Sequence, residues 1–286
     1  MPIKGLTIIG ESINDSVPTT NALYESEDFD GVKELARFQE NGGAKYIDVN
    51  VGTRSTEMME RVAKAVVEAT TVPTSIDSPD YALAEAGLKA CDPSRGKPIL
   101  NSISPLRTEM FDLYKITPFK PILLLTEYLD GSGNGAPSRT VDDVYSAAMY
   151  LFEKAKSLGI PNDDIIFDPG VAPIGTDAEG AFARLIGALE RIHSNPDMQG
   201  VHASVGLSNF TVGLPSKRKA DGEPVKSPLD SALLTIAFPI GLDHVIGSVR
   251  RQYNLLPEDH PAMTCLRECL TLEGFASIRR VRKFYR

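Results

Sequence analysis

Four short apolar runs in this sequence end in an amide or carboxylate side chain immediately before a turn. The polar residues at their ends are Asp77, Asn101, Asp168 and Asn209. The apolar residues suit a buried strand, and each polar side chain lies where its strand stops. If the strands are parallel neighbours in a closed barrel, these side chains gather at one rim, which is the rim where such barrels carry their active sites.

Two earlier runs add groups of the same kind, because Glu11 and Asn14 end the first expected strand and Asp48 and Asn50 end the second. The strand ends offer no histidine, cysteine or Ser–His pair, which argues against a nucleophilic triad and against catalytic zinc. They offer no lysine for a Schiff base either. We therefore expect that this chain binds no metal, although a divalent cation among the carboxylates stays open.

An array of carboxylates and amides is suited to the polar edge of a flat heterocycle. Carboxylates accept hydrogen bonds from ring N–H and amino groups, whereas amides both donate and accept. A pterin presents such an edge, with its 2-amino group, N3–H, N1, O4 and N8–H. For any single residue, capping of a helix N-terminus is the competing interpretation. Repetition at four or more successive strand ends favours a binding site.

Strands and helices that could position these groups alternate along the chain. Strands are expected at 6–13, 46–51, 74–77, 99–103, 121–126, 165–168, 201–207 and 244–249. Helices are expected at 30–41, 57–70, 81–90, 109–115, 141–158, 178–192, 229–240 and 263–283. Eight strands that are each followed by a helix predict a (β/α)8 TIM barrel, formed as a single domain by residues 1–286.

A doubly wound open sheet is the competing architecture. It requires a glycine-rich phosphate turn after the first strand, and the segment at 10–15 lacks that pattern. Two loops, at 129–137 and 215–224, are expected at the same rim as the polar groups. They could be mobile and close over a ligand, or they could be ordinary surface loops.

Composition excludes several classes of protein. The net charge of −8 does not suit phosphate neutralisation, so nucleic acid is not expected as a partner. No apolar run approaches the roughly 20 residues needed to span a membrane, and no signal peptide is expected. Three cysteines favour a reducing compartment, which predicts a cytoplasmic protein. Cys265 and Cys269 are four residues apart, and their spacing favours packing in a helix over a metal pair.

The same polar residues carry a resemblance to a known family. The segments 9–14, 43–50, 77–79, 101–104, 168–170 and 206–209 together resemble the methyltetrahydrofolate:corrinoid methyltransferase family. That family shares its pterin-binding barrel with dihydropteroate synthase. The match follows chain order from the first strand to the seventh, and the ordered set is more specific than any one segment.

The resemblance implies a function and a set of residue roles. Asp77, Asn101 and Asp168 would bind the pterin ring, with Asn209 near the methyl-bearing N5 and Gly206 allowing close approach of the backbone. Glu11, Asn14, Asp48 and Asn50 would support the pocket. Lys217 and Arg218 could meet the glutamate tail of folate or belong to a solvated loop.

The implied reaction is methyl transfer between N5 of tetrahydrofolate and the cobalamin cobalt of a separate corrinoid protein. Tetrahydrofolate and 5-methyltetrahydrofolate are then substrates, the direction of transfer stays open, and a homodimer is possible. Two alternatives remain. A dihydropteroate synthase would carry a Ser-Arg-Lys run where this chain has Ser208-Asn209-Phe210, which weighs against that enzyme. A folate-binding subunit without catalytic activity is the third hypothesis.

Overall fold

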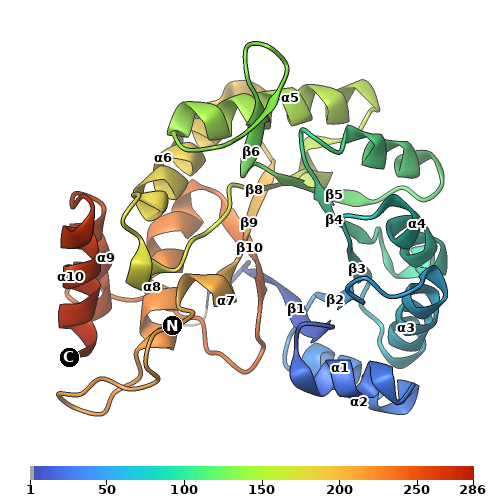
Figure 1. The fold of residues 1–286 in the computed structure, drawn as a ribbon, viewed down its shortest axis with the longest axis horizontal. Helices are drawn as coiled ribbons and strands as arrows, with labels where there is room; N and C mark the ends of the chain where they lie inside the picture. The colour runs from blue at the N-terminus through green and yellow to red at the C-terminus, as the bar shows by residue number, and fades with distance from the viewer. Residues whose placement is uncertain (1–2) are drawn as a thin grey trace.

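A computed structural model describes residues 3–286 and confirms the predicted single-domain (β/α)8 TIM barrel. Parallel strands close into a ring in the order β1-β10-β9-β8-β5-β4-β3-β2 (Figure 1). The strands of the ring are β1 (Thr7–Asn14), β2 (Tyr46–Asn50), β3 (Thr74–Asp77), β4 (Ile99–Ile103), β5 (Lys120–Leu124), β8 (Ile166–Asp168), β9 (His202–Gly206) and β10 (Leu242–Gly247). Pairing of β1 with β10, from Thr7↔His244 to Gly10↔Gly247, closes the ring.

Helices alternate with the strands, and most of them lie outside the ring (Figure 1). They are α1 (Pro18–Glu25), α2 (Phe29–Asn41), α3 (Thr56–Ala69), α4 (Tyr81–Ala90), α5 (Val141–Ser157), α6 (Ala181–Ser194), α7 (Leu207–Phe210), α8 (Lys226–Ala237), α9 (Pro261–Cys269) and α10 (Phe275–Tyr285). Side-chain caps begin several of them; for example, Thr140 and Asp143 form a capping box at the start of α5.

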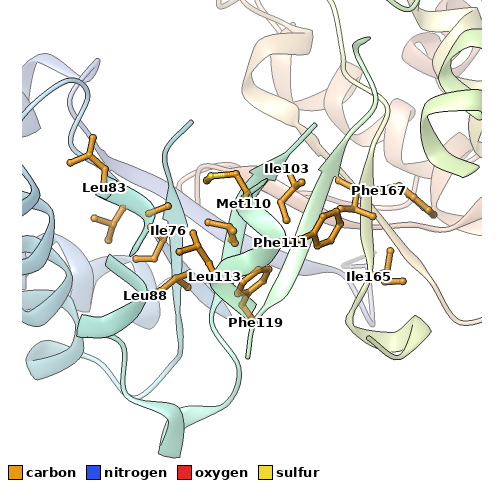
Figure 2. Packing of buried hydrophobic residues seen from close by; sticks show 14 of the residues in the cluster. Ile76, Leu83, Leu88, Ile103, Met110, Phe111, Leu113, Phe119, Ile165 and Phe167 are labelled. Atoms are coloured by element: carbon orange, nitrogen blue, oxygen red, sulfur yellow. The ribbon is translucent and has the colours of Figure 1, made fainter. Parts of the chain in front are cut away.

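The core lies both between helices and strands and inside the ring. Figure 2 shows Ile76 of β3 packed near Leu83 and Leu88 of α4 in the larger helix–strand cluster. A separate cluster of Ile9, Ile99, Ile122 and Ile166 comes from four different strands and fills the barrel interior. Full burial of one such side chain stabilises the fold by about 1.5–3 kcal/mol, so these four isoleucines contribute to the stability of the ring that carries the strand ends.

The structure differs from the sequence prediction in several regions. An additional helix, α1, follows β1, where no element was expected. The loop expected at 129–137 is part of an antiparallel hairpin of β6 (Glu127–Leu129) and β7 (Gly135–Pro137). In its glycine-rich turn, Asp130 Oδ1 accepts hydrogen bonds from the backbone N–H groups of Ser132 and Asn134.

The prediction of a single C-terminal helix at 263–283 was wrong, because this part of the chain forms two helices, α9 and α10. They are separated by a turn in which Gly274 adopts a φ of +54°, a conformation that side chains disfavour. The short helix expected at 109–115 is present as a 3-10 helix, Thr108–Lys115. Within residues 3–286, no helix has the length and apolar character needed to cross a membrane.

Candidate active site at the carboxyl ends of the strands

A cavity of about 620 Å³ opens at the carboxyl ends of the barrel strands. Most of the sequence-predicted site residues line it: Glu11, Asn14, Asp48, Asp77, Asn101, Asp168, Gly206 and Asn209. Hydroxyl groups of Ser12, Ser16 and Thr126 add further polar lining, and Leu124, Val171 and Ile246 provide apolar surface. The cavity therefore combines an apolar wall with many convergent hydrogen-bonding groups, as small-molecule sites do.

Two carboxyl groups from neighbouring strands occupy one side of the cavity. Asp48 of β2 is buried and accepts a hydrogen bond from Ser75 Oγ at 2.5 Å, while Asp77 of β3 accepts one from Asn50 Nδ2 at 2.9 Å. Burial raises the pKa of both carboxyls, and the charge of Asp77 raises the pKa of Asp48 further. Neither carboxyl group has a cationic partner among these contacts, and Asp48 has a further side-chain hydrogen bond with Asn101 of β4.

Asn50 does not line the cavity but donates a hydrogen bond to Asp77, which does. Its side-chain oxygen accepts the backbone N–H of Gly52 at 2.8 Å, which leaves the amide N–H₂ group directed to Asp77. The two contacts fix which end of the amide faces the carboxylate. The predicted supporting role of Asn50 therefore has a specific partner.

Asp168 lies across the ring, at the end of β8. Its carboxylate accepts the backbone N–H of Gly170 at 2.8 Å, and burial raises the pKa of Asp168 to about 7. Gly170 has a φ of +77°, and a Cβ there would lie 2.4 Å from Thr126 Cγ2. Glycine is therefore required by the turn that carries this hydrogen bond.

Glu11 of β1 is joined to the other side of the site by Ser208, whose hydroxyl donates to Glu11 Oε1. Burial raises the pKa of Glu11, while this hydrogen bond and the nearby charge of Arg251 oppose that rise. Ser208 was not predicted as a site residue, although it is part of the matched segment 206–209. A serine beside a glutamate in space leaves no signal in sequence, because 197 residues separate them.

Asn209 lies in α7, the short helix that directly follows β9, and its exposed side chain faces the cavity mouth. A Cβ on Gly206 would lie 2.9 Å from Asn209 Nδ2, so the side chain rests against bare backbone. Behind α7, Thr211 Oγ1 donates to Asp230 Oδ1 at 3.0 Å, and Arg251 Nη1 donates to Asp230 Oδ2 at 2.5 Å. This buried group anchors the end of α7 and hence the position of Asn209.

Lys217 and Arg218 do not line this cavity. The loop 215–224 that carries them packs on the C-terminal helix: Lys219 N donates to Tyr285 O at 2.9 Å, and the Arg218 guanidinium lies 5.1 Å from the Phe284 ring centroid. Arg218 also pairs with Asp221 at 3.2 Å. Neither loop residue contributes to the site in this conformation.

The family model for pterin-binding enzymes matches residues 15–247, which include most of the barrel and most of the cavity-lining residues. The chain belongs to the pterin-binding enzyme family. The resemblance inferred from the strand-end segments is confirmed at this level, and the cavity rim is the part of the barrel that the matched segments build.

Individual relatives extend this finding. The chain is 27% identical over 250 residues to a methylcorrinoid:tetrahydrofolate methyltransferase of Eubacterium limosum, with 84% of each chain covered. Solved dihydropteroate synthases share the fold: that of Thermus thermophilus has a TM-score of 0.55 at 21% identity, covering 93% of this chain and 90% of its own. That of Xanthomonas albilineans, solved with 4-aminobenzoic acid, has a TM-score of 0.53 at 19% identity, covering 93% and 89%.

Proposed function

We propose that this protein is a methyltransferase that moves a methyl group between N5 of tetrahydrofolate and the cobalt of a separate corrinoid protein. The observation that carries the proposal is the ring of carboxylate and amide groups at the barrel mouth with Asn209 at its edge. Similarity to the Eubacterium limosum methylcorrinoid:tetrahydrofolate methyltransferase supports this reaction over other pterin chemistry. The direction of transfer is not part of the proposal.

In this proposal Asp77, Asn101 and Asp168 bind the polar edge of the pterin. Asp77, oriented by Asn50, and Asp168, oriented by the Gly170 N–H, accept hydrogen bonds from ring N–H and amino groups. Asn101 both donates and accepts. Glu11, Asn14 and Asp48 support the pocket wall, and Ile246 and Leu124 contribute apolar contact.

Asn209 is the proposed catalytic residue. N5 carries a methyl group in 5-methyltetrahydrofolate and a hydrogen in tetrahydrofolate, so the side chain beside it must be able to hydrogen-bond to either form. The amide of Asn209 donates a hydrogen bond to the lone pair of N5 or, after rotation, accepts one from N5–H. The corrinoid cobalt supplies the methyl-exchanging centre, so this chain contributes positioning and electrostatics and needs no nucleophile of its own. We propose that it acts in the cytoplasm, where its three free cysteines remain reduced.

One experiment separates this proposal from its alternatives. The purified protein is mixed with a methylated corrinoid protein and tetrahydrofolate, and the cobalt absorbance is followed with time. Loss of the methylcobalt spectrum together with formation of 5-methyltetrahydrofolate supports the proposal. Folate binding by calorimetry without any spectral change would identify a non-catalytic subunit. Formation of dihydropteroate from a pterin pyrophosphate and 4-aminobenzoate would identify a synthase instead.

A further inference from the structure

A second cavity, of about 390 Å³, lies at the amino ends of the strands and therefore at the opposite end of the barrel from the candidate active site. It is bordered by the start of β9, the start of β10 and the end of α6. Two imidazoles and a carboxylate meet beside it, from His202, Asp243 and His244. None of these residues has a role in the proposed methyl transfer.

The three side chains converge closely. His202 Nδ1 lies 2.6 Å from Asp243 Oδ2, and His244 Nδ1 lies 2.7 Å from Asp243 Oδ1. The two imidazole rings are 4.7 Å apart between centroids. One ligand atom from each residue lies within 4.8 Å of the others. Donor atoms around a tetrahedral ion with bonds of about 2.0–2.2 Å are about 3.3–3.6 Å apart, a spacing within the 4.8 Å that spans the ligand atoms of this cluster.

Charged groups of both signs surround the cluster. Asp163 Oδ1 lies 3.4 Å from His202 Nε2, and Lys120 lies within 4 Å of both Asp163 and Asp164. Lys97 pairs with Asp164. Lys120 is engaged by the backbone oxygen of Asp163 at 2.9 Å and by Asp164 Oδ1 at 3.5 Å, so it does not neutralise Asp243 directly.

We propose that His202, His244 and Asp243 bind a divalent transition-metal ion of the zinc class. Imidazole nitrogen together with carboxylate oxygen suits Zn²⁺ and Co²⁺, whereas Mg²⁺ and Ca²⁺ prefer oxygen ligands alone. The cavity leaves room for water to complete the coordination. His202 Nε2 lies 3.4 Å from Asp163 Oδ1, so when Nδ1 binds the ion the opposite N–H can donate to a carboxylate, as metal-binding histidines generally do.

The ligands are held by adjacent strands. His202 is the first residue of β9, and Asp243 and His244 belong to β10, which pairs with β9 in the register His244↔Ser204. An ion here would tie these strands at the end of the barrel opposite the folate site. The proposed role is therefore structural, and it is independent of the proposed function.

Titration of untagged, metal-free protein with Co²⁺ and Zn²⁺ tests the proposal. We expect one equivalent of Co²⁺ to give visible d–d absorption, and we expect Zn²⁺ to displace it and to raise the melting temperature. His202→Ala and Asp243→Asn should each weaken binding at least about tenfold. His193→Ala is the matched control, because His193 lines the same cavity outside the cluster, and its affinity should equal that of the wild type.

The carboxylates of the folate site are the competing location for the metal. Asp77→Asn should keep the Co²⁺ spectrum if the proposal is correct. Absence of absorption and of calorimetric heat with the wild type would overturn it, as would loss of binding in Asp77→Asn with retention in His202→Ala. Because the wild-type titration alone can overturn the proposal, the test holds even if a variant unfolds.

Discussion

Asn50 Nδ2 donates a hydrogen bond to Asp77 Oδ2 at 2.9 Å, which ties the ends of two neighbouring strands together at the rim of the barrel. Asn50 itself does not line the cavity, so its effect on a ligand is transmitted through the carboxylate that it orients. A residue of this kind shapes a site although it touches nothing that binds there.

Asn50→Ala should therefore weaken tetrahydrofolate binding about tenfold, since loss of one hydrogen bond to a charged group costs about 1.5 kcal/mol or more. Calorimetric titration with tetrahydrofolate measures the change. Asn134→Ala, in the exposed turn of the β6–β7 hairpin, is the matched control and should bind as the wild type does. Equal affinity in the two variants would contradict the positioning role of Asn50.

Asn209→Ala should lower the rate of methyl transfer by about 10²–10³, the usual effect of removing one donor from a developing charge. Folate affinity should change less, because in the proposed function Asp77, Asn101 and Asp168 bind the ring edge. Single-turnover absorbance measurements with the methylated corrinoid protein give the rate, and calorimetry gives the affinity. Unchanged transfer would remove Asn209 from the mechanism.

Gly206→Ala should reproduce most of the rate loss of Asn209→Ala while leaving Asn209 in place. The new Cβ would lie 2.9 Å from Asn209 Nδ2 and force the amide to move. Gly131→Ala is the control, because a Cβ there has no atom within 4 Å. Full activity of the Gly206 variant would show that the position of this amide is not critical.

Asp168 should make stability depend on pH. Its pKa in the folded protein is about 7, above the ordinary value of 3.8, so the folded state keeps a proton that the unfolded chain releases. Its contribution to the free energy of unfolding consequently falls as pH rises between these values. Asparagine does not titrate, so Asp168→Asn removes this pH dependence. The free energy of unfolding of the variant minus that of the wild type should therefore increase by about 3 kcal/mol from pH 4.5 to pH 8.

Urea unfolding of both proteins without folate measures that difference. The difference between the two proteins at pH 4.5 is the reference value. At that pH the folded wild type is still protonated at Asp168, and most of its loss of stability develops at higher pH. A difference that does not change with pH would mean that burial of Asp168 is relieved in solution.

Arg251→Met should destabilise the fold by about 3–5 kcal/mol at pH 8, because it leaves the fully buried Asp230 carboxylate without its cation. The pKa of Asp230 is about 6 even with Arg251 present, so protonation at pH 5 should reduce the loss. Urea unfolding at both pH values measures this. Arg267→Met breaks an exposed pair with Glu258 and should cost less than about 1 kcal/mol. Equal costs for the two variants would show that the buried Arg251–Asp230 pair contributes no more to stability than the exposed Arg267–Glu258 pair.

The barrel could be predicted from sequence because its signal is repeated: each apolar strand and each helical stripe supports the same alternation. Glu11, Asp77 and Asp168 could be placed at one rim because parallel strands fix where their ends meet. The break between α9 and α10 was missed because Gly274 interrupts an otherwise helical pattern in a single turn.

Contacts between distant segments could not be predicted. His202 and His244 look scattered in the sequence, and only the pairing of β9 with β10 brings both imidazoles to Asp243. In the same way, nothing local relates Arg251 to Thr211. Both relationships depend on the register between strands and on the path of a connecting loop, which single-sequence patterns do not specify.

The pairing of β1 with β10 has a consequence for how the protein is made. Residues that line the cavity range from Glu11 of β1 to Ile246 of β10, and β10 pairs both with β1 and with β9, the strand that leads to Ser208. A nascent polypeptide that still lacks residues 242–247 has no complete pocket. If the proposed function is correct, folate therefore stabilises the closed barrel and does not guide the earlier steps of folding.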